Sequence, residues 1–212
     1  MRTLVVAGLA TMAAASQASI IFSNFFINSV AMTAGVPVVS SNQVINGASY
    51  TTAGNAVSFS TPGALVGDPV APLRSAIVNL QYDAKSTAGN ANVVTANVNL
   101  GAAVLGPNSS VYFLEQVFEL DSLGNEVGGA IGSISHIFTA ASNPNWSGAI
   151  TLSRQVACLR MKKSLILAAP DTQGLDLAAV AINNQSVQIV PEPAGLAALA
   201  LGGVLVLRRR SK

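Results

Sequence analysis

The chain has 212 residues, of which half are apolar and only 9% are charged, whereas soluble globular domains carry about 25% charged residues. The formal charge is +2, but basic residues gather at the two ends and leave the segment between them net acidic. Nucleic-acid-binding proteins show a basic face, so the composition argues against that class. The single cysteine, Cys158, excludes an intrachain disulfide.

The N-terminal segment has the three parts of a secretory signal peptide. Arg2 precedes an apolar run from Leu4 to Ala15, and small residues lead up to Ala18. This pattern predicts export, with cleavage by signal peptidase between Ala18 and Ser19. The apolar run is too short for a comfortable membrane span. The alternative is an N-terminal helix that is buried in the fold.

The body, residues 19–189, shows the alternation of apolar and polar positions that is typical of β-strands. Strands are expected at 19–27, 76–83, 92–100, 111–120, 134–140, 149–159, 163–169, 175–182 and 186–190. Small polar turns separate them, and no long helical period occurs before Ala194. The predicted fold is therefore all-β, an antiparallel β-sandwich for which a jelly roll is one candidate form. The proline-containing stretch from Thr51 to Leu73 is expected to be a long loop or an irregular edge.

Two polar features of these strands have a simple interpretation. In 111–120, Glu115 and Glu119 lie on the face opposite to the one shared by Tyr112, Leu114, Phe118 and Leu120. The basic cluster at 160–163 is interpreted as one solvated strand edge, because edge strands often carry lysine. This cluster consists of Arg160, Lys162 and Lys163.

Few residues of the body could carry out chemistry. His136 is the only histidine, so a Ser-His-Asp triad would need this residue, and no nucleophile-elbow glycine pattern accompanies a serine. A zinc site would need several histidine or cysteine ligands, so a half-buried structural role is favoured for His136. Cys158 is interpreted as a small buried hydrophobe. Glu115 and Glu119 are about 13 Å apart along a strand, too far for a glycosidase pair. The sequence predicts no catalytic residue, no metal site and no cofactor, and the protein is not expected to be an enzyme.

Two loops invite a binding hypothesis. The segment 121–126 offers carboxylate and amide oxygens for calcium, but Asp121 and Asn125 are expected to bind local backbone groups in a turn. Trp146 lies in a predicted loop, where its ring could stack on a sugar. The alternative for Trp146 is that it caps one end of the sandwich.

The C-terminal segment, 190–212, consists of three parts in order. Pro191-Glu192-Pro193 comes first, followed by 14 uncharged residues from Ala194 to Leu207, and then by three arginines. As a helix, the middle part would be about 21 Å long, shorter than the roughly 30 Å of bilayer hydrocarbon. It would therefore be a marginal membrane anchor.

Together these parts resemble the PEP-CTERM sorting signal of Gram-negative bacteria. The resemblance implies that Pro191, Glu192 and Pro193 form the recognition motif of an exosortase that cuts near them. It implies a transient anchor in the inner membrane and a cytoplasmic stop formed by Arg208, Arg209 and Arg210. It also implies display at the cell surface or release into an exopolysaccharide matrix or biofilm. The alternative is an ordinary single-pass anchor that is never cut.

The expected organisation is a signal peptide at 1–18, a β-sandwich domain at 19–189 and a sorting signal at 190–212. We expect an exported, non-catalytic protein of structural or adhesive type at the surface or in the extracellular matrix. An alternative is a secreted carbohydrate-binding module that uses Trp146. An extracellular hydrolase is a less favoured alternative, since the acidic residues are scattered.

Overall fold

The computed structural model describes residues 19–38, 42–68, 73–87, 89–99, 104–171 and 174–190. In these ranges the chain forms antiparallel β-strands and one 3-10 turn, Gln43–Ile45 (η1). No helix of the described ranges is long and apolar enough to cross a membrane. The predicted signal peptide and the sorting signal from Pro191 onward lie outside the described residues.

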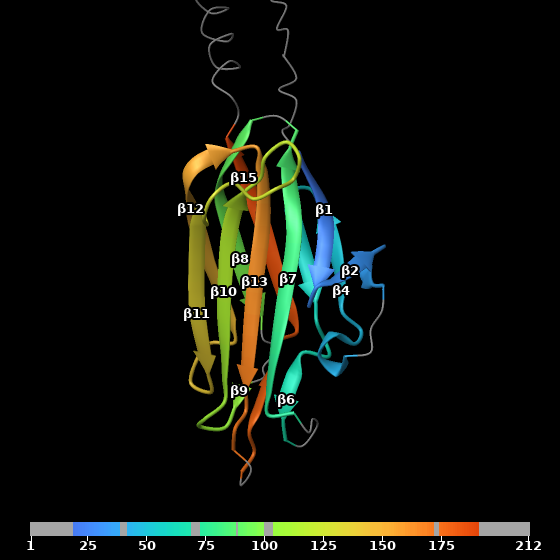
Figure 1. Cartoon of the computed structure of the whole chain (residues 1–212). Coiled ribbons are helices and arrows are strands. Elements are labelled where there is room, and N and C mark those ends of the chain that lie inside the picture. Colours follow the sequence, from blue (N-terminus) through green and yellow to red (C-terminus); the bar gives the residue numbers. More distant parts are fainter. Residues whose placement is uncertain are drawn as a thin grey trace, which may run out of the picture.

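The larger sheet has seven strands in the order β11-β10-β13-β7-β1-β2-β3 (Figure 1). Its strands are Gly132–Thr139 (β11), Ser110–Glu119 (β10), Cys158–Ala168 (β13), Ser75–Ser86 (β7), Ile20–Ile27 (β1), Val30–Thr33 (β2) and Val36–Pro37 (β3). The long strands β10, β13 and β7 lie at its centre and pair over most of their length. This regular centre sets the positions of the side chains on both faces of the sheet.

A second sheet has the order β12-β8-β15-β5-β4. Its strands are Asn145–Val156 (β12), Asn90–Asn99 (β8), Ile182–Val190 (β15), Ala56–Ser60 (β5) and Ser49–Ala53 (β4). A small third sheet is formed by Leu65–Gly67 (β6), Leu177–Ala179 (β14) and Val104–Leu105 (β9). All three sheets are antiparallel, as the sequence predicts.

The core lies between the two larger sheets. Alternate residues of β7 and β10 are buried and pack with residues of β5, β12 and β15 from the facing sheet. At one side, Tyr82 of β7 contacts Phe59 of β5 with ring centroids 5.6 Å apart. Burial of such large side chains is the main favourable term in folding. The jelly-roll form is a finer assignment that stays a prediction.

Three segments differ from the predictions. The expected single strand at 175–182 is broken between β14 and β15, which belong to different sheets. The stretch from Thr51 to Leu73, expected to be a long loop or an irregular edge, contains most of β4 and all of β5 and β6, of which β4 and β6 are edge strands. Gly54 supplies the positive φ of +56° in the turn between β4 and β5. The expected single strand at 149–159 is broken at Ala157, because β12 and β13 belong to opposite sheets. Val156 therefore points into the core from one sheet and Leu159 from the other.

Candidate functional site

The outer face of the seven-stranded sheet carries side chains in cross-strand rows. One apolar row runs Ile137, Tyr112, Ile166, Ile77 across β11, β10, β13 and β7. Two of its members, Ile137 and Ile77, are more than half exposed. A polar row further along the strands runs Gln116, Lys162, Gln81 and ends on Phe26 of β1. This face thus changes from apolar to polar within a few residues.

A shallow depression of about 290 Å³ lies over the β1–β7 pair and is lined by Phe26, Ser29, Asn79 and Gln81. The two-residue turn between β1 and β2 has positive φ at both Asn28 and Ser29, as a type I′ hairpin requires. This turn is fixed by the Asn28 Oδ1 atom, which accepts the Asn79 backbone N–H at 2.8 Å. The turn therefore holds Ser29 at the rim of the depression.

The polar groups of the depression are available to a ligand. Asn79 accepts one hydrogen bond at Oδ1, from the Ser164 hydroxyl at 2.7 Å, and its Nδ2 group donates no hydrogen bond to the described residues. Among the described residues, the Gln81 amide and the Ser29 hydroxyl show no side-chain partner. The depression therefore combines one aromatic ring with amide and hydroxyl groups that are not committed to the fold.

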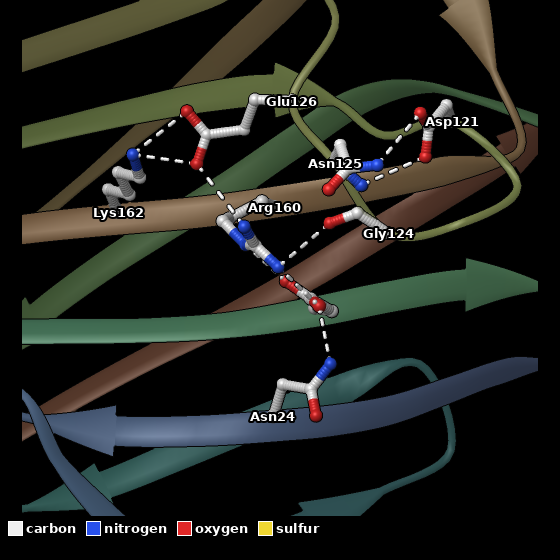
Figure 2. A network of polar contacts seen from close by, with 8 residues as sticks. Asn24, Asp121, Gly124, Asn125, Glu126, Arg160 and Lys162 are labelled. Carbon is white, nitrogen blue, oxygen red and sulfur yellow. Dashed lines mark hydrogen bonds and ion pairs between the residues drawn. The ribbon is translucent and has the colours of Figure 1, made fainter.

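Beside the depression, charged residues are paired with one another (Figure 2). Arg160 on β13 binds Asp83 on β7 in a bidentate pair, at 2.7 and 2.9 Å. Glu126 Oε1 lies 2.7 Å from Lys162 Nζ and 3.4 Å from Arg160 Nη1. These two cations hold the pKa of Glu126 below its usual value. The bulge in β1 places Asn24, with φ +53°, so that its amide donates to Asp83 at 2.7 Å. This network clamps the 120–126 loop onto the sheet.

The loop after β10 is a turn of the kind that the sequence predicts. The Asp121 carboxylate accepts the backbone N–H groups of Leu123 and Asn125 at 2.8 and 2.9 Å. These bonds, those from Asn125 foremost, lower the pKa of Asp121. In the described ranges no three acidic, histidine or cysteine residues come together as a metal-binding group.

Trp146 lies in strand β12, so its predicted place in a loop is wrong. Its ring stacks on His136 of β11 with centroids 4.7 Å apart, and it also contacts Phe113 at 5.6 Å. His136 is half-buried, as predicted, and meets the edge of Phe138. Because His136 covers one face of the indole, only the other could stack on a sugar; that contact stays a prediction.

The face of β10 that carries Glu115 is the buried one. Glu115 is 0% exposed, and the Tyr112 face lies on the outside. The predicted solvated edge at 160–163 was also wrong, because β13 is a central strand and Lys163 is 1% exposed. The sequence held a signal for this burial. Lys163 is two residues from Met161 and from Leu165, so all three lie on the same, inward-facing side of the strand.

Glu115 and Lys163 face each other across the β10–β13 pair and meet Gln185 of the opposite sheet. The Lys163 Nζ atom is 3.8 Å from Glu115 Oε2. On the other side of the carboxyl group, the Gln185 Nε2 amide donates to Glu115 Oε1. Burial raises the pKa of Glu115 and lowers the pKa of Lys163, so both groups are shifted toward their neutral forms.

The surroundings of this cluster are apolar and aromatic. Lys163 Nζ lies 5.9 Å from the centre of the Phe59 ring, and Tyr82 is fully buried nearby. Three buried polar atoms have no hydrogen-bond partner: the Tyr82 hydroxyl, Glu115 Oε2 and Gln185 Oε1. Unpaired polar atoms in a core are costly, so the cluster needs an explanation beyond packing.

Cys158, predicted as buried, is half-buried at the start of β13.

No protein-family model and no curated protein match the sequence. Among solved structures, the chain is similar to TmCBM61 in complex with β-1,4-galactotriose, at 13% identity and a TM-score of 0.32, over 82% of this chain and 90% of that one. A CBM4 structure aligns at 10% identity and a TM-score of 0.29, over 69% of this chain and 79% of the other.

A third similar structure is the enzymatically active domain of bacteriophage CBA120 tailspike protein 4. It aligns at 12% identity and a TM-score of 0.31, covering 78% of this chain but only 20% of the tailspike chain. Similarity at this level indicates neither a shared ligand nor a shared site.

Proposed function

We propose that this protein is an exported β-sandwich module that binds a neutral polysaccharide through the depression on the outer face of its larger sheet. The observation that carries the proposal is the composition of that depression: Phe26 beside the uncommitted polar groups of Ser29, Asn79 and Gln81. This assignment favours the carbohydrate-binding alternative over a purely structural role, and it is compatible with adhesion to an extracellular matrix.

The depression has the chemistry that a saccharide ring requires. An aromatic ring packs against the apolar C–H face of a sugar, and amides both donate to and accept from sugar hydroxyls. Its volume, about 290 Å³, is at the lower end of the roughly 300–1,000 Å³ of small-ligand sites. A chain of sugar units would therefore place one residue in the depression and continue over the sheet.

Charge around the depression favours a neutral ligand. Lys162, the cross-strand neighbour of Gln81, is paired with Glu126, and Arg160 is paired with Asp83. Paired charges attract an ionic ligand only weakly, and salt screens what remains. Recognition would therefore rest on hydrogen bonds and ring packing.

The test is a glycan array followed by titration of the best binder with matched variants. Gln81→Ala removes an amide from the depression, and Gln116→Ala removes the same side chain from the same row two strands away. A lost hydrogen bond of about 1 kcal/mol weakens binding roughly fivefold. We expect this loss for Gln81→Ala and none for Gln116→Ala.

Trp146→Ala is the second arm of that experiment. Retained binding in Trp146→Ala, with loss in Gln81→Ala, agrees with a contact in the depression. Loss confined to Trp146→Ala would move the contact to β12 and overturn the proposed site. The absence of binding to any glycan by the wild-type chain would overturn the function itself.

The export part of the proposal rests on the two terminal sequences. Signal peptidase would cut after Ala18, and an exosortase would cut near Pro191 to Pro193. Mass spectrometry of the protein from its native host should find no peptide beyond about Pro193. Replacing Arg208 to Arg210 with serine should impair retention at the inner membrane. The intact chain, arginines included, persisting in that membrane would contradict processing.

A further inference from the structure

We propose that Lys163 and Gln185 form an intramolecular isopeptide bond, which joins the two sheets of the sandwich, and that Glu115 transfers the proton for its formation. The proposal rests on the buried cluster and not on polysaccharide binding. Its basis is the position of one carboxyl group between an amine and a carboxamide from opposite sheets.

The arrangement places each reacting group on a separate strand. Lys163 of β13 and Glu115 of β10 are direct cross-strand partners in the central part of the larger sheet. Gln185 comes from β15, which lies between β8 and β5 in the facing sheet. Because paired strands hold all three side chains, Glu115 is kept in contact with the carboxamide of Gln185 and 3.8 Å from the amine of Lys163, and such preorganisation favours an intramolecular reaction.

The environment provides the protonation states that the reaction needs. A lysine is a nucleophile only as the neutral amine, and desolvation in an apolar pocket produces that form. Burial lowers the pKa of Lys163 and raises that of Glu115, so the environment shifts the pair toward a neutral amine and a carboxylic acid. The Phe59 ring, 5.9 Å from Nζ, belongs to the apolar wall of the pocket.

The step balances without an added reactant. The Lys163 amine attacks the side-chain carbonyl carbon of Gln185 and forms a new C–N bond. The Glu115 carboxyl group, which lies 3.8 Å from Nζ and contacts the amide nitrogen, accepts one proton from the attacking nitrogen and delivers one proton to the leaving amide nitrogen. The bond to that amide nitrogen breaks, one ammonia leaves, and Glu115 returns to its acid form.

Burial also decides where the catalyst comes from. Glu115, Lys163 and Gln185 are each no more than 1% exposed, so no external enzyme can reach them in the folded chain. The bond must therefore form by the protein's own groups once the sheets have packed. The same exclusion of water protects the product from hydrolysis.

The bond would have a mechanical consequence. β15 ends at Val190, and the predicted sorting motif follows it directly in the sequence. A pull on the C-terminal side would enter the domain through β15. The covalent link would pass that load to β13, a central strand of the larger sheet, and hydrogen bonds between strands would not carry it alone.

The experiment is mass spectrometry of the denatured full-length chain and of its proteolytic peptides. We expect the wild type to be lighter than its sequence by one ammonia, and to yield a branched peptide that joins Lys163 to Gln185. Glu115→Gln keeps the shape of the side chain but cannot exchange the proton, and it should have its full mass. Glu119→Gln, the matched change on the same strand, should retain the bond.

Three results would overturn the proposal. A wild-type chain with full mass and separate Lys163 and Gln185 peptides would exclude the bond. A bond that still forms in Glu115→Gln would exclude the role of Glu115, and a branch from Lys163 to another residue would exclude Gln185. The wild-type peptide map decides the first and third points even if the variant fails to fold.

Discussion

The two charged pairs on strand β13 show how a single strand creates opposite electrostatic environments. Arg160 and Lys163 are three residues apart and face opposite sides of the sheet. Arg160 binds Asp83 through two short hydrogen bonds at a partly exposed site, and this raises the pKa of the guanidinium. Lys163 lies 3.8 Å from Glu115 in the core, and burial lowers its pKa.

Burial, rather than the presence of a partner, sets the direction in which the pKa values of these two pairs shift. On the outer face, hydrogen bonds between Arg160 and Asp83 compensate for the lost hydration of both groups. Arg160 also binds Glu126, and these contacts fix the 120–126 loop. In the core, the desolvation cost exceeds the attraction across a contact of 3.8 Å, so the pKa of each group shifts toward its neutral form. The outer pair is suited to hold structure, and the inner pair is suited to react.

The largest expected effect is on the inner pair. Glu115→Ala removes the proton carrier, so the cross-link between residues 163 and 185 cannot form. By analogy with a disulfide that closes a loop of this length, the free energy of unfolding should fall by about 3 kcal/mol or more. Glu119→Ala, which breaks an exposed pair with Arg154, should cost about 1 kcal/mol at most. Chemical denaturation of both variants measures the difference; equal losses would contradict the comparison.

A smaller effect is expected on the outer pair. Arg160→Ala breaks the bidentate contact with Asp83, and hydrogen bonds between charged groups contribute about 1.5–3 kcal/mol. Arg160→Lys should not restore the loss, because an ammonium cannot bind both carboxylate oxygens in the same geometry. Arg154→Ala is the matched control, with a side chain that is 51% exposed. Thermal unfolding of the three variants provides the ranking, and full rescue by Arg160→Lys would count against a geometric role.

The smallest expected effect depends on pH. Lys162 and Arg160 lower the pKa of Glu126 in the folded state. Glu126 therefore adds stability at pH values above its unfolded pKa, and this contribution is lost as the pH falls through the folded value. The melting temperatures of the wild type and of Glu126→Gln should differ at neutral pH and converge in acid. A difference that is unchanged at low pH would show that charge is not involved.

The sequence predicted the fold class better than the direction of individual faces. Alternation located β1, β7, β10 and β11, because a half-buried strand must alternate. It missed the short strands β4 and β6, whose few residues give no clear period. The inward direction of Glu115 could not be read from β10 alone, since both of its faces carry large apolar residues; the facing strand decides which of them is buried.

The candidate site was only partly accessible to sequence reasoning. Phe26 and Gln81 lie on predicted strands, but their meeting depends on the β1–β7 pairing, which the pattern does not specify. The cluster of Glu115, Lys163 and Gln185 joins residues up to 70 positions apart. Trp146 drew attention as an aromatic residue of a predicted loop, but it lies in β12 and packs against His136.

In the proposed site, the charges beside the depression neutralise one another and leave a surface for uncharged sugars. The most direct test is the affinity of the wild-type chain for a neutral and for an anionic polysaccharide, each measured over a range of salt concentrations. We expect binding of the neutral polymer with an affinity that salt leaves unchanged. Preferential binding of the anionic polymer, with an affinity that falls steeply as salt is added, would contradict a site for neutral polysaccharide.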